Sequence, residues 1–164
     1  MTKPAAMYKI DQMQFIPISL EAAWDFYSNP KNLATVTPDN LGFQIKSELP
    51  DTMYPGMLIE YTVKPLLGIP LTWVTEITNV KEHVYFTDHQ LKGPYATWHH
   101  QHFFKAVSGG TEVRDLVHYQ LPLEPFSRIV HPFLVQPKLN EIFAYREAKM
   151  QELFGRTAPT PTVG

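Results

Sequence analysis

The most constraining feature of this sequence is a long stretch, from Phe43 to Leu121, in which apolar and polar side chains alternate. Turn-forming residues interrupt the alternation at 50–56, 65–70, 79–83, 92–94 and 108–110. Alternation with a period of two is typical of half-buried β-strands, and breaks this short favour antiparallel neighbours. We therefore expect six strands of one meander, at residues 43–49, 57–64, 71–79, 84–90, 97–106 and 111–121.

The chain before this stretch predicts a seventh strand and two short helices. Residues 8–16 alternate loosely between apolar and polar side chains. Ser19 is a favourable N-cap for a helix whose apolar residues recur at helical spacing. Asn29-Pro30 ends that helix and can open a second one, because proline is tolerated at the first helical position.

The last element is a helix from about Pro137 to Phe154, closed by Gly155 and preceded by an irregular or helical lead-in at 125–135. Its apolar face is made by Leu139, Ile142, Phe143, Met150, Leu153 and Phe154. At 100° per residue, Arg146 falls in the centre of that face. Because a buried cation has to be paired, this position predicts that Arg146 contacts a carboxylate inside the fold.

Length and composition exclude several classes of protein. The 164 residues fit one domain, which we place at 7–155, with disordered tails at 1–6 and 156–164. The absence of cysteine excludes disulfides, thiolate metal sites and a cysteine nucleophile. A net charge of −2 argues against nucleic acid as a partner. With no apolar run near the roughly 20 residues that span a bilayer, we expect a cytoplasmic protein without an integral membrane segment.

Three segments resemble a known family: Ile18–Pro38, Phe86–Trp98 and His100–Leu121, together with the dipeptide Tyr145-Arg146. They are similar to the polyketide cyclase/dehydrase branch of the START-like, birch-pollen-allergen-like superfamily (SRPBCC), and the resemblance covers about residues 8–155. It implies an α+β helix-grip fold, in which a curved seven-stranded antiparallel sheet wraps around a long C-terminal helix and leaves a cavity between them. Members bind lipids, sterols, polyketides and other hydrophobic molecules, and only some are enzymes.

The strand register assigns side chains to the concave face. The side of strand 111–121 that carries Asp115 and Tyr119 is the more apolar one and should face inward. Tight turns at 108–110 and 91–95 then set five cross-strand pairs: His102 with Asp115, His100 with Val117, Trp98 with Tyr119, Asp88 with His100, and Gln90 with Trp98.

The register thus predicts a cavity wall with two layers. The aromatic layer consists of Tyr61, Trp73, Gln90, Trp98 and Tyr119. The polar layer consists of Asp88, His100, His102 and Asp115, with Phe143 and Arg146 projecting toward it from the helix.

The polar residues admit four interpretations. They can form a satisfied internal network, with Arg146 on Asp88 or Asp115 and the histidines bridging. They can orient the polar end of an apolar guest. His100 or His102 can act as a general acid or base, which makes these two the candidate catalytic residues. Two histidines with one aspartate can also ligate zinc or iron, although such combinations arise by chance, so we expect no metal and no cofactor.

The sequence therefore predicts a protein that binds a small hydrophobic or aromatic molecule between sheet and helix. We expect the cavity entrance between the 65–70 turn, the 91–96 turn and residues 125–136. The alternative is an enzyme similar to a polyketide cyclase or dehydratase, with His100 or His102 transferring the proton. A third possibility is a non-catalytic interaction module whose cavity is filled by its own side chains.

Overall fold

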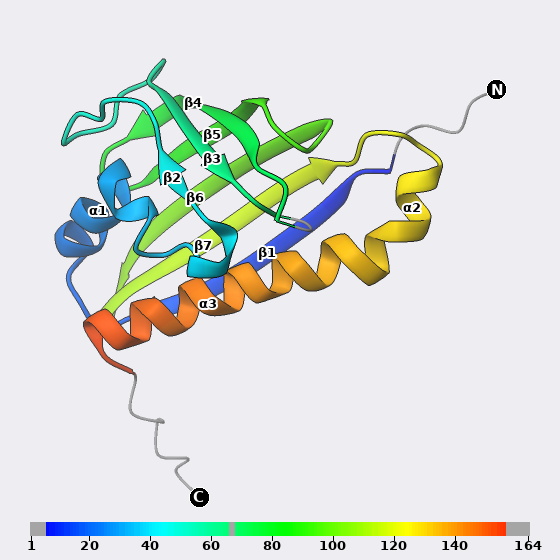
Figure 1. Ribbon diagram of the computed structural model, residues 1–164. Helices are drawn as coiled ribbons and strands as arrows, with labels where there is room; N and C mark the ends of the chain where they lie inside the picture. The colour runs from blue at the N-terminus through cyan, green and yellow to red at the C-terminus, as the bar shows by residue number, and fades with distance from the viewer. Residues whose placement is uncertain (1–5, 66–67, 157–164) are drawn as a thin grey trace, which may run out of the picture.

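The structure, a computed structural model, describes residues 6–65 and 68–156. Seven strands form one antiparallel sheet in the order β1-β7-β6-β5-β4-β3-β2 (Figure 1). From β2 to β7 the strands follow one another as a meander, and β1 pairs with β7 at the far edge. The strands are β1 (Tyr8–Ile16), β2 (Gln44–Ile45), β3 (Leu58–Val63), β4 (Leu71–Lys81), β5 (Tyr85–Lys92), β6 (Thr97–Val107) and β7 (Gly110–Gln120).

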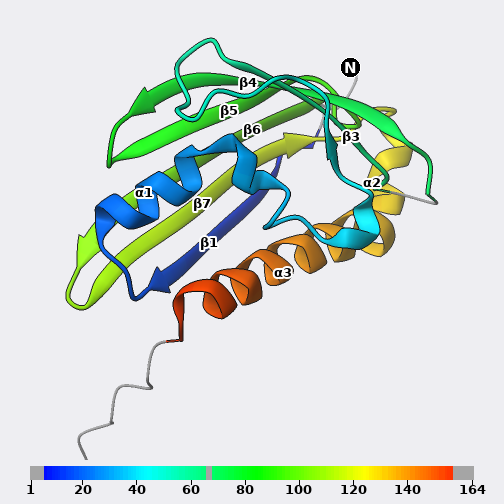
Figure 2. The same cartoon turned by 60° about the vertical axis from the view of Figure 1, so that its left-hand side comes forward.

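The helices lie in two groups. Helix α1 (Leu20–Ser28) and the 3₁₀ turns η1 (Pro30–Leu33) and η2 (Asp39–Leu41) connect β1 to β2. After β7 come α2 (Phe126–Val130), η3 (His131–Val135) and α3 (Gln136–Phe154). The sheet curves over α3, and α1 packs on β6 and β7 (Figure 2). The predicted α+β helix-grip fold is confirmed.

Local chemistry accounts for the first helical pair. The Ser19 hydroxyl accepts a hydrogen bond from the amide of Ala22 at 3.1 Å, which satisfies one of the free amides at the start of α1. The Asn29 side chain accepts a bond from the Lys31 amide at 3.0 Å in the same way, and Pro30 opens η1.

One strand is shorter than the sequence predicts, and the lead-in to the last helix takes one of its two expected forms. The strand expected at 43–49 is reduced to β2, because the amides of Lys46 and Ser47 both bond to the carbonyl of Glu60 and the regular ladder stops there. The lead-in is helical and continues into α3, with a π-helical turn at η3. Pro132 and Pro137 lack the amide hydrogen of a regular α-helix, and the wider turn of η3 occurs where these prolines fall.

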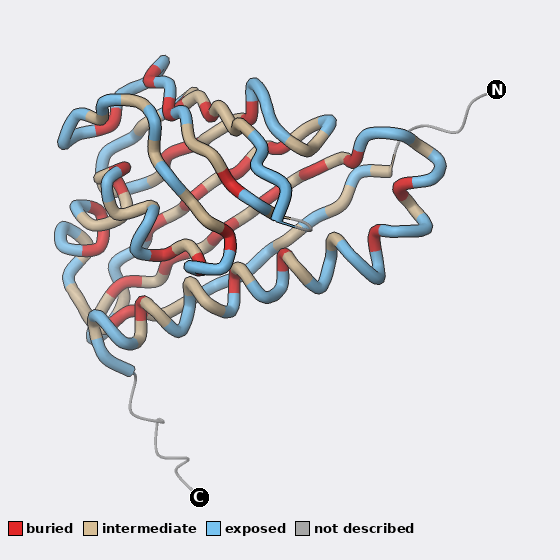
Figure 3. The backbone as a smooth tube through the Cα atoms, viewed as in Figure 1, coloured by how far each residue is buried: buried red, intermediate tan, exposed pale blue. Residues whose placement is uncertain are grey.

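Buried and partly buried residues alternate along β6 and β7 (Figure 3). The buried side chains form two apolar clusters, one around Trp24, Phe104 and Met150 and the other around Trp98 and Phe143. On β6, His100 and His102 lie between Trp98 and Phe104, so the polar residues separate the two clusters.

The first cluster provides a test of the helix placement. Met150 is fully buried on α3, whereas Met13 on β1 is 60% exposed. Met150→Ala should lower the free energy of unfolding by about 2–5 kcal/mol, because it removes buried methylene groups and leaves a cavity. Met13→Ala, the matched control, should change it little. Urea denaturation followed by circular dichroism measures both, and equal effects of the two substitutions would contradict this placement of α3.

Parts of the sequence expectation lie outside the described residues. These are 1–5 and 157–164 of the predicted tails, and residues 66–67 of the turn expected at the cavity entrance. Within the described part of the chain, no helix is long and apolar enough to cross a membrane.

Candidate functional site

The register of β5, β6 and β7 brings the predicted polar residues together. Asp88 on β5 lies opposite His100, and His102 lies opposite Asp115 on β7. His100 faces Val117 and Trp98 faces Tyr119, as the tight turns require. The pairing of β5 with β6 ends at His89 and His99, so the expected pair of Gln90 with Trp98 does not form.

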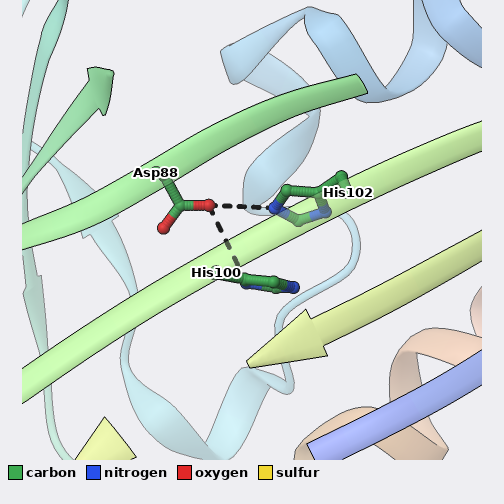
Figure 4. A group of neighbouring side chains, drawn as sticks. All are labelled: Asp88, His100 and His102. Carbon is green, nitrogen blue, oxygen red and sulfur yellow. Dashed lines mark hydrogen bonds and ion pairs between the residues drawn. The ribbon is translucent and has the colours of Figure 1, made fainter. Parts of the chain in front are cut away.

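The hydrogen bonds run diagonally across these strand pairs. His100 Nε2 lies 2.8 Å from Asp115 Oδ1, and His102 Nε2 lies 2.9 Å from Asp88 Oδ2. Figure 4 shows the Asp88 carboxylate directed at both rings, with His100 Nδ1 at 3.8 Å. His102 Nδ1 lies 2.8 Å from Asp115 Oδ1 but is not aligned for a hydrogen bond. The two imidazole rings are 3.8 Å apart between centroids.

Arg146 reaches this cluster from α3, as its position in the apolar stripe predicts. Its Nη1 lies 3.7 Å from Asp115 Oδ1, and its guanidinium lies 5.4 Å from the centre of the Phe143 ring. The Nε–H of Arg146 is buried and has no partner among the described residues. The arginine therefore balances one of the two buried carboxylates and keeps a free donor.

Burial and charge act on these groups in opposite directions. Burial raises the pKa of both aspartates, but the two histidines outweigh it, so the pKa of Asp88 is lowered and that of Asp115 falls well below its ordinary value. Burial and the neighbouring His102 lower the pKa of His100. For His102, burial is outweighed by the two aspartates, so its pKa is raised. Of these two histidines, His102 therefore keeps its proton to the higher pH.

The directions of these pKa shifts predict how the stability of the protein, with no metal bound, depends on pH. Stability contributed by His102 is complete below its unfolded pKa of about 6.5 and is lost as the pH rises through its raised folded pKa. Stability contributed by neutral His100 is present above about 6.5 and is lost as the pH falls toward its lowered pKa. NMR titration of the imidazole signals should give a higher pKa for His102 than for His100. The reverse order would contradict the assignment.

A cavity of about 200 Å³ lies beside this cluster, between the sheet, the α1–η2 segment and α3. Of the predicted site residues, those that line it are Tyr61, Trp73, Asp88, Trp98, His100, His102, Phe143 and Arg146. The side chains of the aromatic layer meet in the wall, where Tyr61 and Trp73 stack at 5.7 Å and Trp98 meets Trp73 edge-on at 5.7 Å.

Three predicted residues do not line this cavity. Gln90 binds the backbone of Tyr95 through both ends of its amide, which closes the turn between β5 and β6. Tyr119 Oη lies 2.7 Å from His131 Nε2, and both residues are buried. Asp115 lies behind the histidines and lines a second, polar pocket of about 170 Å³ between β1 and α3, together with Arg146.

Sequence reasoning missed a large part of the cavity wall. The segment from α1 to the loop before β3 supplies Phe26, Tyr27, Leu33, Val36, Leu41, Phe43 and Met53. Tyr95, from the turn after β5, also lines the cavity and lies 4.7 Å from Trp98 between ring centres. Strand register cannot identify such residues, because they lie in helices and loops. The sequence signal that could have found them is the large number of bulky apolar side chains in these segments.

The comparisons identify the fold. No family model matches the chain, and no curated protein matches it in sequence. Among solved structures, a point mutant of norcoclaurine synthase from Thalictrum flavum, in complex with a transition state analogue, matches with a TM-score of 0.65 and 15% identity, over 93% of this chain and 99% of that one.

Two further solved structures match nearly as well. The protein Ara h 8.0201 has a TM-score of 0.61 and 15% identity, over 90% of this chain and 99% of its own. The major latex-like protein 151 from Panax ginseng has a TM-score of 0.59 and 14% identity, over 87% and 96%. The likeness to the START-like, birch-pollen-allergen-like superfamily is thereby confirmed at the level of the fold.

Proposed function

We propose that this protein binds a small hydrophobic or aromatic molecule in the cavity between the sheet and α3. One observation carries the proposal: a largely apolar cavity of about 200 Å³ meets a few polar side chains at one place in its wall. Binding sites for small molecules combine these two features, because apolar surface provides affinity and a few polar groups fix the orientation.

The rings of the wall favour a flat guest. Tyr61, Trp73, Tyr95 and Trp98 contact one another with centroid distances of 4.7–5.7 Å, in stacked, tilted and edge-on arrangements. Aromatic side chains present large rigid faces on which a planar molecule can stack. An aromatic or polyketide-like guest fits this wall better than a bulky saturated one.

Buried polar atoms favour a guest that also carries oxygen atoms. Within the described residues, Tyr27 Oη, Trp73 Nε1 and Arg146 Nε are buried without a hydrogen-bond partner, and all three residues line the cavity. Unsatisfied buried donors are uncommon in folded proteins. Side-chain movements that turn these donors toward the cavity would let carbonyl, phenol or carboxylate oxygens of the guest accept hydrogen bonds from them.

The fold supports the same general kind of function. The resemblance to the START-like superfamily implies binding of hydrophobic molecules, and the norcoclaurine synthase structure of the same fold is a complex with a transition state analogue. The side chains that line this cavity, and not the related structures, determine which guest it binds.

Titration with 8-anilinonaphthalene-1-sulfonate, a flat aromatic anion, tests the proposal. Its fluorescence should rise and saturate at one probe per chain, and the probe should raise the melting temperature, because a ligand that binds only the folded state stabilises it. Fluorescence that grows without saturation, with an unchanged melting temperature, would contradict binding in the cavity.

A second candidate function is proton transfer in a cyclase- or dehydratase-like reaction. The observation that favours it is that His100 and His102 both line the cavity beside Asp88. Turnover of a polyketide-like substrate should then fall in His100→Ala or His102→Ala while binding persists. Unchanged turnover in both variants would exclude these residues. The third possibility, an interaction module with a filled cavity, is disfavoured by the open volume.

A further inference from the structure

We propose that Asp88, His100 and His102 form a binding site for one divalent transition-metal ion, open toward the cavity. The three residues lie on neighbouring strands and direct their polar atoms at one point (Figure 4). The site is distinct from the binding of an organic guest, because it can be occupied and measured without one.

The distances between the ligand atoms suit a single ion. One atom from each residue lies within 4.8 Å of the other two. Asp88 Oδ2 is 2.9 Å from His102 Nε2 and 3.8 Å from His100 Nδ1. An ion bound at about 2.0–2.2 Å from each atom holds adjacent ligand atoms about 3 Å apart or somewhat more. Small side-chain adjustments therefore bring all three atoms into coordination.

The opposite nitrogen of each ring faces the same carboxylate. His100 Nε2 and His102 Nδ1 both lie 2.8 Å from Asp115 Oδ1, and His100 is aligned for a hydrogen bond. Histidines that ligate metals characteristically donate their other N–H to a carboxylate, which fixes the tautomer and the ring orientation. Asp115 is thus placed as the positioning residue of the site, and Arg146, at 3.7 Å, holds Asp115 from behind.

The three ligand residues also face the right way for an open site. Asp88, His100 and His102 line the apolar cavity, whereas Asp115 lines only the polar pocket on the other side. Coordination from one side leaves further positions on the ion free toward the cavity. Two histidines and one carboxylate with open positions suit Zn²⁺ or Fe²⁺.

The charges near the site define what the open positions would take. Asp88 and Asp115 contribute two negative charges and Arg146 one positive charge. With a divalent ion and neutral histidines, the group carries a net positive charge. An anionic or ionisable oxygen of the guest, such as a carboxylate, phenolate or enolate, would therefore complete the coordination.

Titration of Zn²⁺ into chelator-treated full-length protein, without organic guest, tests the site by calorimetry. One ion should bind per chain. Asp88→Asn should weaken binding by at least about 100-fold, because it removes a ligand. Asp115→Asn should weaken it by about 10–100-fold and keep the stoichiometry, as for other carboxylates that orient ligating histidines. Circular dichroism verifies that each variant is folded.

A control and a second readout keep the test decisive. His89, His99 and His118 lie side by side on the outer face of β5, β6 and β7 and could collect metal adventitiously. Joint replacement of these three by Gln should leave Zn²⁺ binding intact. In the unaltered protein, paramagnetic Co²⁺ should broaden the ring signals of His100 and His102 before those of the outer histidines. No stoichiometric binding, or binding lost only in the outer-face variant, would overturn the proposal.

Discussion

Replacement of Asp115 by Asn should lower the free energy of unfolding of the metal-free protein by about 3–5 kcal/mol. The Asp115 carboxylate accepts the hydrogen bond of His100 and lies within 2.8 Å of His102 and 3.7 Å of Arg146. Asn keeps the shape of the side chain but removes the charge. Arg146 would then lose the carboxylate that lies 3.7 Å from it, and His100 would lose the charged acceptor of its hydrogen bond. A buried charge without its partner is costly.

Urea unfolding monitored by circular dichroism measures this loss. The matched control is Asp11→Asn on the neighbouring strand β1, where the carboxylate pairs with Arg114 at the surface. Arg114 binds Asp11 through two hydrogen bonds, but exposed ion pairs contribute only about 0–1 kcal/mol, so the control should lose much less stability than Asp115→Asn. If Asp115→Asn behaved like this control, the buried cluster would not be a mutually dependent network.

Ile142→Trp should strongly weaken guest binding while leaving the fold intact. Ile142 lies on α3 in the cavity wall and is only partly buried, so a larger side chain can extend into the open volume. An indole would occupy much of the space that a guest needs. Affinity for the fluorescent probe should fall at least tenfold, which corresponds to about 1.4 kcal/mol. The melting temperature without probe should be unchanged or higher, because a filled cavity gains contacts.

Ala144→Trp is the control for this substitution. Ala144 is exposed on the same helix, two residues further on, and does not line the cavity. The same indole placed there should leave probe binding unchanged. Equal loss of binding in both variants would indicate that the probe binds at the surface of α3 instead of in the cavity.

The polar half of the site could be predicted because it depends on strand register. Once the turn at Ser108–Gly110 closes the β6–β7 hairpin, alternation alone places His102 opposite Asp115, and one short turn further back places Asp88 opposite His100. Arg146 follows from helical periodicity in the same way, because a charged residue in the apolar stripe of α3 has to meet a buried partner.

The other half of the cavity wall could not be predicted, since no short-range rule positions it. Leu41 comes from the short turn η2, and Phe43 and Met53 come from irregular segments; contacts with the sheet and α3 set the path of all three. Tyr119 lies on the inward face, but its hydroxyl is hydrogen-bonded to His131. Strand register cannot predict this contact, because His131 lies in the π-helical turn η3. Gln90 was placed correctly on its strand, but its amide binds the turn instead of facing the cavity.

Native mass spectrometry of freshly purified protein tests the central claim most directly. We expect a population heavier than the chain by the mass of one small molecule, and denaturation should release that molecule. Ile142→Trp should remove the heavier species, whereas Ala144→Trp should retain it. A chain that carries no small molecule, and that also fails to take up the fluorescent probe at one site, would contradict the claim that this cavity binds a guest.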